Sequence, residues 1–492
     1  MTSRQGEWDP AVQSVPVVVE LDPVPDVVVS LNAFTELDDV VLLESRIDRE
    51  EVSRYSFLVA DPVEFVTHES AELGVDPFAR LRVLLREWEA RPVPGLPPFQ
   101  GGVMGVLGYE LGAAWEATPR SSEDEFALPA LAAGLYDAVV AWDHVLGRAW
   151  VISQGFPETD PERRWQRAKR RAVEWVARLS ATGQSESATG VVSPTVFERS
   201  DLSPSWPVAG HDGLYSDFSR ESYLESVGRL IESIHAGEIF QANLSQRLIA
   251  TQPVPALELY TRLRRLNPAP FAAYMSHDDW QIVSASPERF VSLRDGEVET
   301  RPIKGTRRRP RDPDVGVLVQ GELTESEKDQ AENVMIVDLL RNDLSRVCRP
   351  GTVTVPLLCG VEVYETVLHL VSEVRGQLRE GLTAWELLEA VFPGGSITGA
   401  PKLRAMELIA EIEPTVRGPY CGSLFYVGCD GSMDSSILIR TFVVRRGWVQ
   451  CSVGGGIVAD SDPVSEYNET MDKAAGMLWA LGCGDGDGPV DR

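Results

Sequence analysis

Apolar residues recur at two different spacings along the chain, and these spacings predict two kinds of element. Short runs of β-branched and aromatic residues predict strands at residues 17–21, 40–43, 55–59, 238–250, 280–284, 422–427, 435–444 and 449–452. Apolar residues at every third or fourth position predict helices at residues 77–89, 161–179, 220–236, 330–344, 383–392 and 464–481. A Gly-punctuated apolar segment at residues 99–109 predicts a tightly packed strand pair rather than a phosphate loop. Because the strands come in runs with helices interspersed, the pattern predicts an α+β fold with large antiparallel sheets.

Composition divides the chain into five expected segments. Residues 1–15 lack a periodic pattern and predict a disordered tail. A β-rich region is expected at residues 16–182, followed by a linker at 183–215 that is rich in Ser, Thr, Gly and Pro. A second, larger domain is expected at residues 216–482, and residues 483–492 are expected to form a flexible tail.

The overall charge excludes several classes of partner. The 492-residue chain carries a formal net charge of −28. This charge argues against binding to nucleic acid or to an anionic membrane, because both require a basic surface. No apolar run reaches the roughly 18 residues that a membrane helix needs, and no secretory signal precedes the first strand. The six cysteines form no C-x-x-C pair, which indicates thiols in a reducing compartment such as the cytoplasm.

Lysine is rare, and its positions are informative. Only five of the 46 basic residues are lysine, at positions 169, 304, 328, 402 and 473. Lysine can lose its proton and act as a nucleophile, whereas arginine stays charged. Lys169 lies in a basic run and is explained by composition alone. Lys304, in Arg-Pro-Ile-Lys-Gly-Thr-Arg, is the better candidate for chemistry that arginine cannot perform.

Two predicted helices carry clustered carboxylates. Glu466, Glu469 and Lys473 are spaced by three and four residues, so they share one face of the last helix. This face is interpreted either as a solvated surface with Lys473 as counter-ion or as a site for Mg²⁺, which prefers carboxylate oxygens, waters and an anionic substrate. Residues 327–333 form a second acidic stretch with the same two interpretations.

Two Gly-rich segments could bring the backbone close to a ligand. Residues 393–402 resemble a phosphate loop in composition but lack its spacing, because Leu403 follows Lys402. Residues 454–456 are three consecutive glycines, whose N–H groups could hold a carboxylate. A tight turn is the alternative interpretation of these glycines.

Several motifs, in the same order along the chain, resemble those of the chorismate-binding enzymes. This family includes anthranilate synthase large chains, aminodeoxychorismate synthase component I, and isochorismate and salicylate synthases. The resemblance covers residues 219–482 strongly and the N-terminal region, which is similar to the same region of anthranilate synthase component I, more weakly. The motifs lie at residues 303–306, 331–344, 369–372, 394–402, 404–406, 454–459 and 466–473. The resemblance implies large antiparallel sheets packed as a sandwich, with helices outside.

The resemblance also implies which reaction to expect. Hydrolytic members carry a lysine base where this chain has Gln241, so the nucleophile here is expected to be ammonia. Anthranilate synthases usually have Ala where this chain has Lys304, and lysine is the pattern of aminodeoxychorismate synthases. We therefore expect amination of chorismate at C4, for p-aminobenzoate and folate or for a p-aminobenzoate-derived metabolite. The sequence contains no glutaminase segment, so a glutamine amidotransferase subunit is the expected partner.

The resemblance assigns roles to individual residues. It implies Lys304, His369 and Glu332 as catalytic residues, with neutral Lys304 attacking C2 and His369 or another acid protonating the leaving oxygen. The implied Mg²⁺ ligands are Glu332, Glu466 and Glu469. The implied substrate-binding residues are Gly305, Thr306, Ser396, Tyr420, Arg440, Gly454, Gly455, Gly456 and Lys473.

Two further segments resemble the halves of the tryptophan pocket of this family. Residues 42–45 and 267–272 supply Ser45, Pro270, Phe271 and Ala272. Phe271 and Ala272 depart from the commoner Tyr-Met pair, so occupancy stays open, and an apolar seam between two sheets is the alternative. Two rival functions also stay open: an anthranilate synthase large chain that carries Lys304, and a non-catalytic scaffold subunit.

Overall fold

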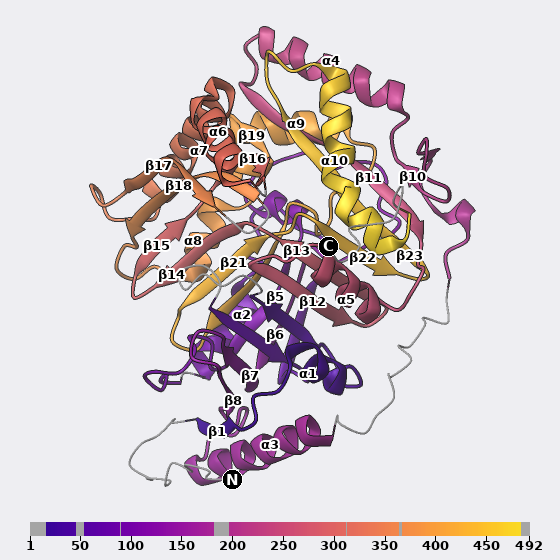
Figure 1. Cartoon of the computed structure of the whole chain (residues 1–492). Coiled ribbons are helices and arrows are strands. Elements are labelled where there is room, and N and C mark those ends of the chain that lie inside the picture. The colour runs from indigo at the N-terminus through magenta and orange to yellow at the C-terminus, as the bar shows by residue number, and fades with distance from the viewer. Residues whose placement is uncertain are drawn as a thin grey trace.

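Two antiparallel sheets dominate the described part of the chain (Figure 1). The computed structural model describes residues 16–45, 54–88, 90–181, 196–310, 312–363 and 367–483. Within these residues the first sheet has 13 strands, in the order β1 (Val17–Leu21), β8 (Arg148–Ser153), β7 (Ala138–Asp143), β3 (Tyr55–Val59), β2 (Val41–Glu44), β12 (Phe271–His277), β13 (Trp280–Ser286), β22 (Thr441–Arg445), β23 (Trp448–Ile457), β11 (Gln241–Thr251), β10 (Tyr215–Ser216) and β9 (Trp206–Pro207), with β19 (Gly399–Ala400) paired to β11.

The second sheet has 10 strands within the same described residues. Its order is β16 (Ile303–Arg308), β18 (Val367–Gln377), β15 (Glu297–Thr300), β14 (Arg289–Arg294), β21 (Met433–Ile437), β20 (Ser423–Gly428), β5 (Gly102–Leu107), β6 (Leu131–Tyr136) and β4 (Glu64–His68), with β17 (Thr354–Val363) paired to β18. Both sheets combine strands from early and late parts of the chain. Ala272 on β12 lies opposite Glu44 on β2, and Phe425 on β20 lies opposite Gly105 on β5.

The two sheets pack face to face, and helices cover their outer faces. Side chains such as Phe57, Ile282 and Tyr426 form the buried layer between the sheets. The outer face of the first sheet packs against α1 (Val27–Phe34), α3 (Pro161–Ala181), α5 (Ala256–Leu266) and α10 (Pro463–Leu481). The outer face of the second packs against α2 (Ala79–Glu87), α7 (Glu327–Ser345) and α8 (Ala384–Val391). The α+β sandwich with helices outside is therefore confirmed.

Three further helices pack against β11 and β16. Helices α4 (Arg220–His235) and α9 (Lys402–Ile412) pack on β11, and α6 (Pro313–Glu325) lies against β16. Figure 1 shows α6 and α7 beside β16, and α10 along β23. None of the helices in the described part of the chain is long and apolar enough to cross a membrane.

Local signals in the sequence explain why the helices begin and end where they do. Thr383 and Glu386 form a reciprocal capping box at the start of α8. Asp462 caps α10 by accepting the N–H of Ser465 at 2.9 Å, with Pro463 in the first turn. Gly482 ends α10 in the left-handed conformation, with φ of 79°. The predicted helices are all present, with ends that differ by a few residues.

Two strand predictions are wrong. Residues 99–109 do not form a strand pair: β5 is one strand, and the chain then turns into a short 3₁₀ helix, η1 (Tyr109–Ala114). There the Tyr109 N–H donates to Gly418 O at 2.7 Å instead of continuing the sheet. Residues 435–444 are not one strand either, because Arg440 takes a positive φ of 51° between β21 and β22.

The segment predicted as a linker is described only from residue 196. From there the chain runs along the edge of the first sheet, where it contributes β9 and β10. Trp448 Nε1 donates to Phe197 O at 2.9 Å and attaches this segment to β23. The predicted tails at residues 1–15 and 483–492 lie outside the described residues, except for Cys483.

Candidate active site

Lys304 lies at a β-bulge in β16. The pairing of β16 with β18 shifts register between Lys304 and Thr306, and the intervening Gly305 has a positive φ of 72°. A Cβ at Gly305 would lie only 2.9 Å from Leu323 of α6, so this position favours glycine for space as well as for conformation. Bulges redirect neighbouring side chains. The bulge therefore explains why Gly follows Lys304 in the motif.

The Lys304 ammonium lies among groups of both charges. Its Nζ donates to Ser396 O, at 3.3 Å, in the 3₁₀ turn η4 (Gly395–Ile397). Burial lowers the pKa of Lys304, and the nearby Glu332 and Glu288 carboxylates oppose that shift. The neutral amine, the nucleophilic form, is therefore easier to reach than for a lysine in water.

Glu288 is a candidate catalytic residue that the sequence analysis missed. Its side chain is 6% exposed, and Ser396 Oγ donates to its Oε1 at 3.2 Å. Burial raises the pKa of Glu288 to about 7, against the opposing charge of Lys304. Ser396 therefore connects an amine with a lowered pKa to a carboxyl with a raised pKa. The available signal was an acidic residue two positions after the end of the apolar strand β13, but no periodic pattern marks it.

The glycines at 454–456 lie inside β23, so their interpretation as a tight turn is wrong. Gly454, Gly455 and Gly456 lie opposite Ser245, Leu244 and Asn243 of β11. The Asn243 and Ser245 N–H groups turn away from β23, and they donate to Thr398 O and Glu413 Oε1, both at 2.8 Å. Hydrogen-bonded and non-bonded pairs alternate in antiparallel strands. The Gly455 N–H therefore belongs to the ladder, and the Gly454 and Gly456 N–H groups point away from β11.

Three charged side chains of α10 converge over Gly455. A Cβ at Gly455 would lie 3.1 Å from Glu466 Oε2, 3.8 Å from Glu469 Oε1 and 3.9 Å from Lys473 Nζ. Lys473 Nζ bonds Glu469 Oε1 at 2.8 Å and Gly454 O at 2.9 Å. Because residue 455 has no side chain, these three charged groups can lie close to the backbone of β23.

The carboxylates of this cluster differ in their environment. Glu466 is buried, and its burial raises its pKa. Burial alone would raise the pKa of Glu469 too, but the bonded Lys473 ammonium holds it below its ordinary value. Glu332, on α7, also has a pKa raised by burial, with the Lys304 and Lys328 charges opposing the shift. Glu332 thus lies within electrostatic reach of Lys304 as well as of Glu466.

Two carboxylates of this cluster, Glu466 and Glu469, fit the binding of a hard divalent cation. Glu466 Oε2 is buried without a hydrogen-bond partner among the described residues, and Glu469 Oε1 faces the same point above Gly455. In the described ranges no three His, Cys, Asp or Glu side chains are already placed around a single metal position. Two carboxylates with waters and an anionic substrate are a usual Mg²⁺ environment. The residues present therefore fit Mg²⁺ with Glu466 and Glu469 as the first ligands.

Gln241, the first residue of β11, lies next to the three glycines of β23. A Cβ at Gly456 would lie 2.1 Å from Gln241 Nε2, so the side chain crosses directly over that glycine. Gln241 is 1% exposed, and its Oε1 has no hydrogen-bond partner among the described residues. A buried carbonyl oxygen without a donor is costly. This oxygen is therefore available to a ligand that carries N–H groups.

Three predicted residues remain: Arg440, Tyr420 and His369. Arg440 has no acidic partner among the described residues, and burial lowers its pKa; Tyr420 is buried, with the Arg417 guanidinium 5.8 Å from its ring centroid. His369 is buried on β18 opposite Thr306, for which only the backbone is described. The glutamates Glu332, Glu288 and Glu469 and the Lys473 ammonium are among the charges that act on Lys304.

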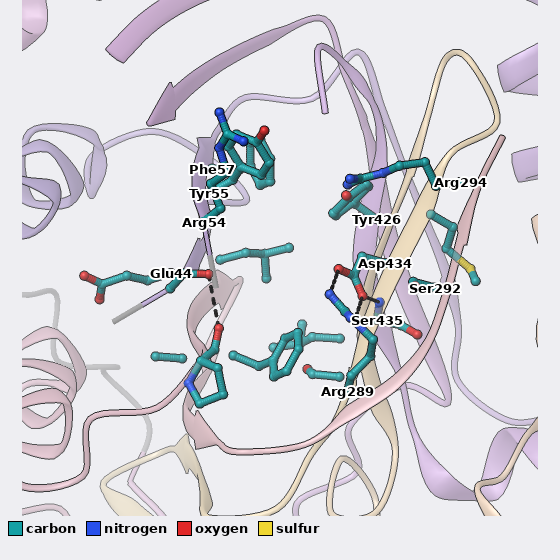
Figure 2. A pocket seen from close by; sticks show the side chains of 18 of the residues that line it. Glu44, Arg54, Tyr55, Phe57, Arg289, Ser292, Arg294, Tyr426, Asp434 and Ser435 are labelled. Carbon is teal, nitrogen blue, oxygen red and sulfur yellow. Dashed lines mark hydrogen bonds and ion pairs between the residues drawn. The ribbon is translucent and has the colours of Figure 1, made fainter. Parts of the chain in front are cut away.

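A separate cavity of about 260 Å³ lies between the sheets. Ser45, Pro270, Phe271 and Ala272 all line it, and Ser45 Oγ donates to Pro270 O at 3.2 Å (Figure 2). The two segments that resemble a tryptophan pocket are therefore adjacent, because β2 pairs with β12. No residue that lines this cavity belongs to the cluster around Lys304.

Comparisons with known proteins agree with this arrangement. The family profile described as chorismate binding enzyme matches residues 38–479. The chain is 39% identical over 482 residues to aminodeoxychorismate synthase component 1 of Salmonella typhimurium, which covers 95% of this chain and 98% of the relative. It is 40% identical over 462 residues to anthranilate synthase component 1 of Streptomyces coelicolor, which covers 93% and 87%.

A solved structure supports the same assignment. Anthranilate synthase component I from Streptococcus pneumoniae superimposes with a TM-score of 0.70 at 28% sequence identity, covering 86% of this chain and 92% of the other. Motifs, fold and relatives agree over nearly the whole length. The chain belongs to the chorismate-binding enzymes.

Proposed function

We propose that this protein is an aminodeoxychorismate synthase component I, which converts chorismate and ammonia to 4-amino-4-deoxychorismate. The proposal rests on Lys304, which is half-buried and lies at the β-bulge in β16. Burial lowers the pKa of its amine. An amine in this environment can act as a covalent catalyst. Product analysis with chorismate, Mg²⁺ and ammonium tests the proposal.

Lys304 and Glu288, which bond the backbone carbonyl and the hydroxyl of Ser396 respectively, suit the first step. Transfer of one proton from the Lys304 ammonium to the Glu288 carboxylate creates a nucleophile and an acid together. Neutral Lys304 attacks C2 of chorismate, the ring double bonds shift, and the C4–O bond breaks. The Glu288 proton leaves with that oxygen as water, so hydroxide need not be expelled as an anion.

Gln241 suits the second step. Its unpaired Oε1 can accept a hydrogen bond from ammonia and hold it close to the ring, and a glutamine cannot deprotonate water. Ammonia attacks C4, the double bonds shift back, and the bond between C2 and Lys304 breaks. A proton from the new C4 amine returns to Glu288, so the overall exchange is ammonia in and water out.

The anionic substrate requires positive and hydrogen-donating groups. Arg440, Tyr420 and the outward N–H groups of Gly454 and Gly456 would hold the enolpyruvyl carboxylate. Glu466, Glu469 and Glu332 would hold Mg²⁺, whose charge would neutralise the ring carboxylate. Without that ion, Lys473 is the cation that faces Glu469. The positive charge of Lys473 therefore reduces the repulsion between the acidic face of α10 and the chorismate dianion.

Anthranilate synthesis is the alternative function. It is supported by the 40% identity to the Streptomyces coelicolor anthranilate synthase component 1, which is as high as the identity to aminodeoxychorismate synthases. In that reaction ammonia itself would attack C2. The identity of residue 304 favours C4 amination, because a nucleophilic side chain would occupy the position from which ammonia must approach C2.

The first prediction concerns the metal ligands. Replacing Glu469 or Glu332 by alanine should lower kcat by about 10²-fold or more, as the loss of roughly 3 kcal/mol of charge stabilisation implies. Circular dichroism should show an intact fold, because neither side chain belongs to an apolar core. Asp472→Ala is the matched control on α10, since Asp472 is exposed. Wild-type turnover in Glu469→Ala, or activity that survives EDTA, would contradict the assignment.

The second prediction concerns the source of ammonia. A glutaminase needs a cysteine with a lowered pKa, whereas burial raises the pKa of all six cysteines here. The chain alone should therefore convert chorismate with ammonium salts and ignore glutamine. Addition of a glutamine amidotransferase subunit should confer glutamine use. Glutamine-dependent turnover by the homogeneous chain would show that this account of the partner is wrong.

A further inference from the structure

Asn243 is a buried polar side chain that takes no part in the steps of the proposed mechanism. It is 9% exposed, and its Nδ2 has no hydrogen-bond acceptor among the described residues. Amide donors are seldom buried without an acceptor, because such a donor loses its hydrogen bonds to water and gains none in return. The Asn243 Nδ2 is therefore a candidate for a donor whose acceptor belongs to a bound ligand.

The backbone of Asn243 is held on both sides, so the side chain is not needed to keep this part of β11 in place. The Asn243 N–H donates to Thr398 O at 2.8 Å, and the Asn243 C=O accepts from Arg417 Nη2 at 2.6 Å. Arg417 is fixed in turn by Glu413, which accepts from its Nε at 2.9 Å. Main-chain bonds thus set the position of Asn243, while its amide N–H group stays unpaired.

Strand β11 places Asn243 beside Gln241, which is proposed to hold ammonia. Side chains alternate across a strand, so these two side chains lie on the same face, roughly 7 Å apart along the strand. Asn243 is also paired with Gly456, the glycine over which the Gln241 amide passes. The two amides are therefore neighbours, one with an unpaired acceptor and the other with an unpaired donor.

Tyr420 is a second donor close to the Asn243 amide. Burial, and then the neighbouring Cys421, raise the pKa of Tyr420, whereas the Arg417 guanidinium and the Asn243 amide oppose the shift. The phenol therefore keeps its proton at neutral pH. Asn243 is near enough to act on this hydroxyl, yet its Nδ2 makes no hydrogen bond of ordinary geometry within the described ranges.

The segment that carries Arg440 lies next to these donors. The Cys421 N–H donates to Leu438 O at 2.8 Å, which joins the residue after Tyr420 to the chain just before Arg440. A guanidinium with two neutral donors nearby suits a carboxylate, which has two acceptor oxygens and a negative charge. A hydroxyl or ether oxygen would not need the charge.

We propose that the Asn243 Nδ2 donates to the enolpyruvyl carboxylate of chorismate and shares that carboxylate with the Tyr420 hydroxyl. Asn243 then holds the enolpyruvyl group while Gln241, on the same strand, holds ammonia. The inference rests on the proposed placement of chorismate. It does not depend on whether ammonia attacks C2 or C4, because both carbons adjoin C3, which carries the enolpyruvyl group.

Calorimetric titration of the full-length chain in Mg²⁺ tests the proposal with two unreactive benzoates. In 3-(1-carboxyvinyloxy)benzoate both carboxylates of chorismate are present, and in 3-(isopropenyloxy)benzoate a methyl group replaces the enolpyruvyl carboxylate. The wild-type chain should bind the diacid at least tenfold more tightly than the monoacid. Because neither probe reacts, the result stands whichever product the enzyme makes from chorismate.

Two variants assign the difference to Asn243. Asn243→Leu should bind the diacid about tenfold more weakly, as the loss of a hydrogen bond to a charged group implies, and should bind the monoacid like wild type. Asn243→Asp, which brings a negative charge to the carboxylate, should weaken the diacid by about 100-fold or more. An equal loss of affinity for both probes, or an unchanged affinity for the diacid, would overturn the proposal.

Thermal unfolding and steady-state kinetics separate binding from a structural role. Asn243→Leu keeps the branched shape and removes a buried donor without an acceptor, so the ligand-free variant should unfold at the same temperature as wild type or higher. Its KM for chorismate should rise about tenfold with kcat nearly unchanged. Asn342→Leu, at an exposed position of α7, is the matched control and should behave like wild type. A lower unfolding temperature together with an unchanged KM would show a structural role only and overturn the proposal.

Discussion

Replacing Lys304 by alanine is expected to slow the formation of 4-amino-4-deoxychorismate by about 10²-fold or more, because the variant loses its covalent nucleophile. Lys304→Arg should be nearly inactive despite keeping the positive charge, since a guanidinium does not deprotonate. Residual attack of ammonia at C2 should become visible in Lys304→Ala as anthranilate. Chromatography of the products with mass detection measures all three outcomes, and Lys169→Ala, an exposed lysine on α3, is the control.

A trapped intermediate provides the complementary test of Lys304. Wild-type protein given chorismate and Mg²⁺ without ammonia should acquire a substrate-derived mass on the peptide that contains Lys304. The Lys304→Ala protein should not. If no adduct can be trapped and the alanine variant still makes 4-amino-4-deoxychorismate at the wild-type rate, covalent catalysis by this lysine is excluded.

Replacing Glu288 by glutamine should lower kcat by about 10²- to 10⁴-fold, the range expected when a general acid is lost. Glutamine keeps the hydrogen bond from Ser396 but cannot give a proton to the leaving oxygen. Thermal unfolding should change little, because the amide has nearly the same size. His369→Gln is the comparison that identifies the acid: if it abolishes the acid-dependent step and Glu288→Gln does not, His369 is the proton donor.

The dependence of the reaction rate on pH tests the role of Glu288 separately from that of Lys304. The pKa of Glu288 is raised to about 7, so its carboxyl is protonated below that pH and loses the proton above it. The wild-type rate should therefore fall as the pH rises through about 7. Lys304 acts in the opposite direction, because its amine becomes nucleophilic only as the pH rises toward its lowered pKa. In Glu288→Gln the fall at higher pH should disappear.

Local patterns in the sequence were sufficient for several parts of the site. The spacing of Glu466, Glu469 and Lys473 predicted a shared helix face, and these side chains do converge over Gly455. The scarcity of lysine drew attention to Lys304. The α+β class followed from the order of the strands and helices, because hydrophobic spacing reports on local structure directly.

Features that depend on distant partners could not be predicted in this way. Gly454, Gly455 and Gly456 are part of a strand because β11, about two hundred residues earlier in the chain, pairs with them. The importance of Glu288 arises from Ser396, which is separated from it by 108 positions. The break between β21 and β22 depends on the left-handed conformation of Arg440, and no residue typical of turns, such as glycine, marks that position. Tertiary contacts decide these features, and local propensity does not.

The most direct test of the central claim is the identity of the product. The purified chain should be incubated with chorismate, Mg²⁺ and an ammonium salt, and the product identified by chromatography and mass spectrometry against standards. The account predicts 4-amino-4-deoxychorismate, which yields 4-aminobenzoate when a lyase is added. Anthranilate as the main product of the wild-type chain would contradict it, and so would the absence of any chorismate turnover.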